Sequence, residues 1–167
     1  MFHAPDGSLI SLSEAVGEVV AFMKRDDSRS YKIIIGTDSL ITRHAGPAGG
    51  LPGQGAFADF VTAIVVHRVG NGGRYFWKKI REEPVFNLRD RIIKEALYSI
   101  DMARDVNLLL GNAESPAFSF EIHADIGVNG PTKELISEVV GMIRANNFPC
   151  FIKPFSFGAS TVADRHA

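Results

Sequence analysis

The sequence predicts an α/β domain with a mixed sheet, and three observations lead to this prediction. Residues 31–37 form a run of apolar, mainly β-branched residues, which is typical of a strand buried on both faces. Residues 60–68 and 74–80 have the pattern of a β-hairpin, with a glycine-rich turn between them. From residue 87 onward, helix-like and strand-like segments alternate. A meander followed by such alternation produces a mixed sheet that is covered by helices.

The helices and the remaining strands follow from local signals. Ser11 and Glu14 form a capping box, which predicts a helix that begins at about residue 12. Asn87 can cap a long helix that continues to about residue 107. The other predicted elements are a strand over 118–125, a helix over 133–144, a strand over 150–153 and a short last helix that carries Asp164 and His166. The predicted order is therefore one helix followed by β-β-β-α-β-α-β-α, with five strands.

Composition and charge exclude several classes of protein. The chain has 167 residues, a single cysteine (Cys150) and a formal net charge of −1. One cysteine excludes an internal disulfide and a cysteine-based zinc cluster. The net charge gives no overall electrostatic case for nucleic acid, although a local basic stripe would suffice. The first residues do not resemble a signal peptide, and no apolar run reaches the ~18–20 residues that span a bilayer, so we expect a cytoplasmic protein with no membrane partner.

Three acidic residues are the first candidates for a site. Asp38 and Asp125 each follow a predicted strand, and parallel neighbouring strands would bring both to the edge of the sheet where ligand sites form. Either residue alone also fits an ordinary turn. Glu95 falls on the apolar face of the long predicted helix. An inward carboxylate is costly unless it is paired, protonated or metal-bound, so a structural ion pair with Lys153 is the alternative to a metal site.

Asp164 adds a fourth carboxylate in the last predicted helix, where it also fits a surface residue. Four carboxylates supply only oxygen ligands, which suits Mg²⁺ or Mn²⁺ and does not suit zinc. Two such ions can clamp a phosphodiester, activate the attacking water and stabilise the leaving oxygen. The chain has neither the G-x-S-x-G pattern of a nucleophile elbow nor a phosphate-binding Walker sequence.

Four segments of the chain carry a family resemblance. They are residues 35–39 (IGTDS), 60–68 (FVTAIVVHR), 121–127 (EIHADIG) and 162–166 (VADRH). In this order they resemble the YkuK-type family of uncharacterised bacterial proteins, which is assigned to the RNase H-like superfamily. The resemblance covers nearly the whole chain from about residue 8. One departure is a Gly- and Pro-rich stretch at 43–56, for which we expect a loop.

The resemblance implies an RNase H-like fold over residues 29–167 as one globular unit, with residues 1–28 as an N-terminal helical extension packed on it. In nucleases of this superfamily the acidic site comes from the first strand, the helix after the hairpin, the fourth strand and the last helix. The matching residues are, in turn, Asp38, Glu95, Asp125 and Asp164. The resemblance therefore implies phosphodiester hydrolysis with two Mg²⁺ or Mn²⁺ ions bound by these four residues.

Two histidines are lesser candidates. Glu121, His123 and Asp125 alternate along a strand and face one side of it, so His123 can support the site or be a hydrogen-bonded core histidine. His166 lies two residues after Asp164, where it can assist proton transfer or be a disordered terminal residue.

Basic residues gather in sequence around the hairpin and the start of the long helix. With Tyr75 and Trp77 nearby, they can contact phosphates and stack a base, or they can form an ordinary solvated face. They are Lys78, Lys79, Arg89, Arg91 and Lys94. The leading hypothesis is a metal-dependent nuclease that acts on RNA, an RNA–DNA hybrid or structured DNA. The alternative is an inactive RNase H-like domain that binds nucleic acid or a protein partner.

Overall fold

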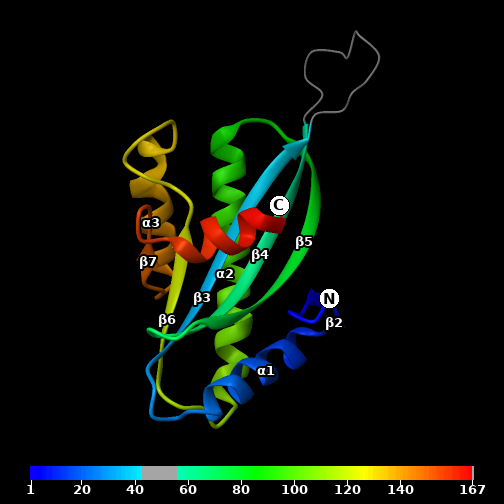
Figure 1. Cartoon of the computed structure of the whole chain (residues 1–167). Coiled ribbons are helices and arrows are strands. Elements are labelled where there is room, and N and C mark those ends of the chain that lie inside the picture. Colours follow the sequence, from blue (N-terminus) through cyan, green and yellow to red (C-terminus); the bar gives the residue numbers. More distant parts are fainter. Residues whose placement is uncertain (43–55, 167) are drawn as a thin grey trace.

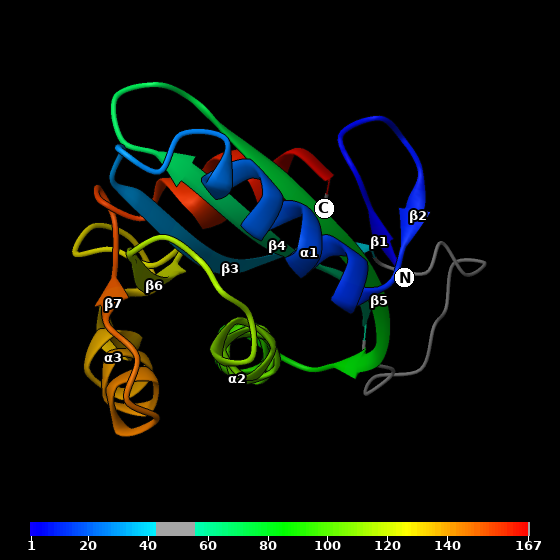
Figure 2. The same ribbon diagram turned by 90° about the horizontal axis from the view of Figure 1, so that it is seen from below.

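One sheet with helical elements on both of its faces organises the molecule (Figures 1 and 2). The computed structural model describes residues 1–42 and 56–166. The predicted loop at 43–56 lies outside these residues except for Ala56, which begins a strand. The helices are α1 (Leu12–Lys24), α2 (Leu88–Gly111) and α3 (Ile136–Ala145). Three short helical turns are η1 (Lys133–Leu135), η2 (Gly158–Ala163) and η3 (Asp164–His166).

The sheet has seven strands in the order β2-β1-β5-β4-β3-β6-β7. The strands are β1 (Phe2–His3), β2 (Leu9–Ile10), β3 (Tyr31–Thr42), β4 (Ala56–Arg68), β5 (Gly73–Val85), β6 (Phe118–Ala124) and β7 (Cys150–Phe151). The pairs β3–β6 and β6–β7 are parallel, and the other pairs are antiparallel. The predicted mixed α/β class is therefore confirmed.

The predicted count of five strands is wrong. The five expected strands are β3 to β7, and β1 and β2 add a short hairpin at the edge of β5. Each added strand has two residues, which is too short for an alternating pattern to be seen in the sequence. The N-terminal extension is consequently part helix and part strand, while the boundary placed at residue 28 stays a prediction.

The capping signals of the two long helices are present in the structure. The Ser11 hydroxyl accepts a hydrogen bond from the Glu14 backbone N–H, and the Glu14 carboxylate accepts one from the Ser11 backbone N–H. The Asn87 side-chain oxygen accepts a hydrogen bond from the Asp90 backbone N–H at 2.8 Å. These caps satisfy backbone donors that a helix leaves unpaired, so they fix where α1 and α2 begin.

Strand β3 lies inside the sheet between β4 and β6, and its residues 33–37 are buried on both faces, as predicted. Ile33 and Ile35 point to the side of α1 and α2 and belong to the main hydrophobic core. Ile34 points to the other side, where it packs with Val61 and Ala163. Ala163 belongs to the C-terminal segment η2–η3, which crosses β3 and β4 on the face away from α2 (Figure 1). In the part of the chain that the structure describes, no helix is long and apolar enough to cross a membrane.

Candidate active site

Asp38 and Asp125 lie next to each other because of the parallel pairing of β3 with β6. The ladder of paired residues ends at Thr37 opposite Ala124, and the two aspartates are the next residue of each chain segment. The prediction that Asp38 closes its strand is wrong, because β3 continues to Thr42 along β4, with Asp38 opposite Val61. The shared edge is thus the point at which β6 leaves the sheet. By alternation from Ile34, Asp38 faces the side crossed by the C-terminal segment.

Glu95 projects inward from α2, as the helical pattern predicts, and is only 5% exposed. The Ser39 hydroxyl donates a hydrogen bond of 2.6 Å to its Oε1 atom. The predicted alternative, an ion pair with Lys153, is wrong. The Lys153 ammonium instead lies 2.9 Å from Oδ2 of Asp125.

The pKa values of Glu95 and Asp38 are both raised, first of all by burial. Burial raises the pKa of Glu95 to about 8, and the charges of Asp38 and Asp125 add to the rise. Burial raises the pKa of Asp38 to about 6, and the charges of Asp125 and Asp164 add to it. In both cases a hydrogen bond from Ser39 and the charge of Arg91 oppose the rise. Asp38 therefore lies within electrostatic reach of the other three carboxylates, and Glu95 within reach of Asp38 and Asp125.

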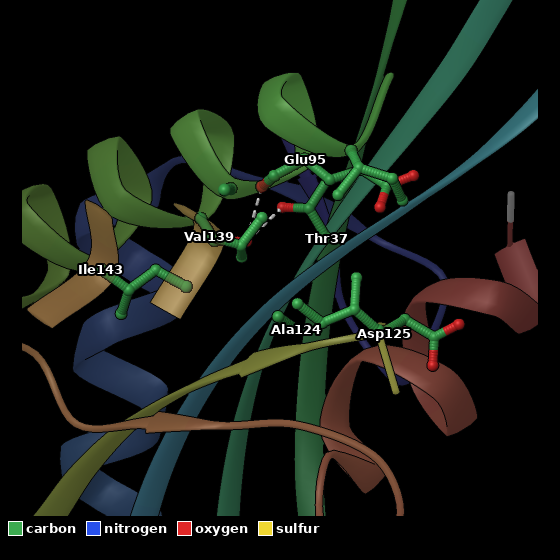
Figure 3. Close-up of a pocket in the computed structure, with 10 residues that line it drawn as sticks. Thr37, Glu95, Ala124, Asp125, Val139 and Ile143 are labelled. Carbon is green, nitrogen blue, oxygen red and sulfur yellow. Dashed lines mark hydrogen bonds between the residues drawn. The ribbon is translucent and has the colours of Figure 1, made fainter. Parts of the chain in front are cut away.

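The four acids reach this region from four separate segments. Asp38 comes from β3, Glu95 from α2, Asp125 from the end of β6, and Asp164 from the first residue of η3. Figure 3 shows that the carboxylates of Glu95 and Asp125 point to the same side, away from Ile143. Thr37 of β3 lies between them, and Val139 and Ile143 close the other end of the pocket that they share.

The donor set fits a hard divalent cation in its chemistry. All four side chains offer carboxylate oxygens, which Mg²⁺ and Mn²⁺ prefer. Oδ1 of Asp125 is buried and has no hydrogen-bond partner among the described residues, so one oxygen is left for a ligand. Within residues 1–42 and 56–166, however, no group of three or more His, Cys, Asp or Glu side chains is arranged to hold an ion. Side-chain rotation would have to bring the carboxylates together.

Of the five predicted nucleic-acid-binding residues, only Arg91 lies at the acidic residues. Its Nη1 donates to the backbone oxygen of Ser39 at 2.8 Å, and its buried Nε has no hydrogen-bond partner in the described part of the chain. The other four do not form one surface with it. Arg89 pairs with Glu138, Lys94 pairs with Glu82 and Asp90, Lys79 lies 4.0 Å from Asp59, and Lys78 lies over the ring of Phe2.

The two histidines have different surroundings. His123 is 1% exposed, and its Nε2 lies 3.2 Å from Oε2 of Glu121. These are the contacts of a hydrogen-bonded core histidine, and burial lowers the pKa of His123. His166 is described by the structure and packs on Trp77, with its Nε2 3.4 Å from the Tyr75 hydroxyl. Burial, together with the charge of Arg165, lowers its pKa as well.

Ser39 is the residue that sequence reasoning missed. Strand alternation points it away from Asp38 toward α2, where its hydroxyl holds Glu95. A separate set of buried hydroxyls lies on the same side of the sheet. The Ser99 hydroxyl donates to that of Thr37 at 2.9 Å, and the Thr37 hydroxyl lies 3.0 Å from that of Thr62. Ser99 and Glu95 share one face of α2, so a polar stripe on the apolar face was the available signal.

Comparisons with known proteins agree with the fold and with the resemblance. Residues 14–167 match the family model described as ribonuclease H-like. The chain is 30% identical over 179 residues to the uncharacterized protein YkuK of Bacillus subtilis (strain 168), a match that covers 99% of this chain and 95% of that protein. No solved structure matches the chain significantly. The chain therefore belongs to the ribonuclease H-like family, and within it to the YkuK type.

Proposed function

We propose that the protein is a metal-dependent nuclease that hydrolyses phosphodiester bonds of nucleic acid. The observation that carries this proposal is the set of four acids from four segments: Glu95 is buried and subject to the charges of Asp38 and Asp125, and Asp38 is subject to those of Asp125 and Asp164. A buried carboxylate lowers the free energy of unfolding, and binding a cation at this point would offset that loss. Membership of the ribonuclease H-like family supports a nucleic-acid substrate.

Each residue has a distinct role in this proposal. Asp38, Glu95, Asp125 and Asp164 would hold the ions, which supply an activated water and charge stabilisation at the scissile phosphate. Ser39 orients Glu95 through its 2.6 Å hydrogen bond. Arg91 keeps a positive charge beside Asp38 and Glu95, which favours their ionised, ion-binding forms. Lys153 holds Asp125 at its Oδ2 atom and leaves Oδ1 for an ion.

A second candidate function is an inactive RNase H-like domain that binds nucleic acid or a protein. One observation favours it: the Lys153 ammonium already stands at Asp125, so a fixed positive charge offsets one of the acids. Such a domain needs no ion in order to bind its partner. The two functions therefore differ in whether Mg²⁺ or Mn²⁺ binds to the acids and alters the activity and melting temperature of the protein.

Activity on labelled nucleic acids tests the proposal directly. Single-stranded RNA, duplex DNA, an RNA–DNA hybrid and branched DNA are incubated with the purified protein and Mg²⁺, Mn²⁺ or Ca²⁺. We expect cleavage with Mg²⁺ or Mn²⁺ and none with Ca²⁺, because the larger ion spreads its ligands and misplaces the attacking water. Salt-sensitive binding without cleavage of any substrate, under any ion, would favour the inactive domain.

Ion binding should also raise the melting temperature of the wild-type protein. Mutual repulsion among the acids weakens the metal-free fold, and a bound cation removes it. If Kd is about 0.1 mM, 10 mM Mg²⁺ adds about 2.7 kcal/mol to the free energy of unfolding. For a chain of this size that corresponds to a rise of roughly 5–10 °C in a thermal scan.

Potassium chloride at the same ionic strength is the control for this measurement, since it screens charges without binding between carboxylates. Exposed Asp101, on the same helix as Glu95, provides the matched variant, and Asp101→Asn should keep the full ion-induced rise. An equal rise with potassium chloride, or no rise with either divalent ion, would contradict a specific metal site.

A further inference from the structure

Trp77, the single tryptophan of the chain, lies between two histidine rings. Its ring centroid is 4.0 Å from that of His3, with 13° between the planes, and 4.3 Å from that of His166, with 10° between the planes. Two nearly parallel rings at this spacing occupy opposite faces of the indole. Trp77 therefore has no free face for a nucleic-acid base, contrary to what the sequence suggested.

The stack connects both ends of the described chain to the sheet. His3 lies in β1 and is the cross-strand partner of Trp77 in β5. His166 ends the C-terminal segment, and its Nε2 lies 3.4 Å from the hydroxyl of Tyr75, two residues before Trp77 on the same face. The last helical turn is thus attached to β5 through two aromatic side chains.

Asp164 depends on this attachment for its position. It begins η3, a turn of only three residues, and its side chain is exposed. So short a turn is not stable by itself. On one side Asp164 is preceded by Ala163, which is fully buried against Ile34 and Val61. On the other side it is followed by His166 on Trp77, so the two contacts together set the place of the carboxylate.

We propose that Trp77 is a positioning residue for the acidic site: by stacking on His166 it fixes the turn Asp164–His166 and holds the Asp164 carboxylate near Asp38. The proposal rests on the proposed function, because it assigns Asp164 to the ion site. In the described contacts, Trp77 itself touches none of Asp38, Glu95 and Asp125. Strand β1 also supports the site in this proposal, because its His3 stacks on Trp77.

Mn²⁺ affinity, measured by calorimetry on the full chain, tests the proposal. Trp77→Leu and His166→Ala should each weaken binding about 5- to 10-fold, because each removes the ring contact that holds the turn. Trp77→Phe should retain most of the affinity, because a phenyl ring can still stack. The double variant Trp77→Leu/His166→Ala should bind no more weakly than either single variant, since both act through one contact.

Phe148→Leu is the matched control. Phe148 is also partly buried, its ring contacts that of Phe120, and it packs against the main core without lining the pocket of Glu95 and Asp125. This variant should keep the wild-type affinity within about twofold, while its melting temperature falls as for any lost ring. The comparison separates positioning of Asp164 from a general loss of stability.

Fluorescence of Trp77 provides a readout that needs no metal. His166→Ala should shift the emission of the metal-free protein to longer wavelength, because loss of the stacked ring exposes one face of the indole to water. Unchanged emission would show that the stack does not form in solution and would overturn the proposal. Wild-type Mn²⁺ binding that is equalled by Trp77→Leu, or additive losses in the double variant, would overturn it while the metal site stands. Absence of Mn²⁺ binding by the wild type would refute the proposed function and this role together.

Discussion

Replacing Asp38 with asparagine should abolish nuclease activity, with a fall of at least about 10³-fold in the cleavage rate, and should leave the fold intact. Asp38 lies on the interior strand β3, and the charges of Asp125 and Asp164 both act on it. An amide oxygen has nearly the same shape but no charge with which to hold a divalent ion. Because burial disfavours the ionised form of Asp38, the metal-free variant should be at least as stable as the wild type.

The measurement is single-turnover cleavage of the best substrate, with circular dichroism and urea unfolding to check the fold. Asp101→Asn is the matched control: it makes the same chemical change at an exposed position of α2 and should retain full activity. Asp38→Asn should still bind the substrate, and this binding should weaken steeply with salt. Equal cleavage by Asp38→Asn and the wild type would identify a contaminating nuclease and would contradict the assignment of Asp38.

The acidic site could be predicted in outline because one local periodicity and the pairing of two strands determine it. The helical period of 3.6 puts Glu95 on the apolar face of α2, and the structure buries it there. Asn87 caps the helix at the expected place, so the predicted face is the observed one. The pairing of β3 with β6 then places Asp38 beside Asp125. That step needed the topology, which came from the order of elements and the family resemblance.

Details that depend on distant partners were not predictable. Strand β3 continues past Asp38 because β4 extends equally far and pairs with it, and no local signal marks that end. Lys153 pairs with Asp125, because the chain after β7 returns to the end of β6. A prediction of the partner of Lys153 would have required the position of this segment in space, which the sequence does not reveal.

In the cluster of basic residues, strand alternation limits what closeness in sequence predicts. Lys78 and Lys79 are consecutive residues of a strand, so they must point to opposite faces of the sheet. In the structure Lys78 lies over Phe2, while Lys79 lies by Asp59 on the other face. Closeness in sequence therefore overstated the size of a common basic surface. Arg91 at the acidic residues is a better candidate for a phosphate contact than the cluster as a whole.

Glu95→Gln should make the metal-free protein more stable at alkaline pH and remove the pH dependence that Glu95 causes. The folded-state pKa of Glu95 is about 8, above the ordinary value of 4.5 for a glutamate, so the folded protein binds a proton that the unfolded chain releases. The stability linked to this proton is complete below the unfolded pKa and is lost as pH rises through the folded pKa. Between pH 6.5 and 8.5, above the pKa of Asp38, the wild type should lose about 2 kcal/mol of unfolding free energy.

Urea unfolding of the metal-free proteins at these two pH values measures the effect, and Glu134→Gln, at an exposed position of η1, is the matched control with wild-type behaviour. Glutamine has no charge to lose and can still accept the hydrogen bond from Ser39, so Glu95→Gln should keep its stability at pH 8.5. It should also lose the stabilisation by Mg²⁺, because the ionised carboxylate is the form that binds an ion. Destabilisation of Glu95→Gln by about 3–5 kcal/mol at both pH values would instead identify Glu95 as half of a structural pair, with Arg91 as the charge left without its partner.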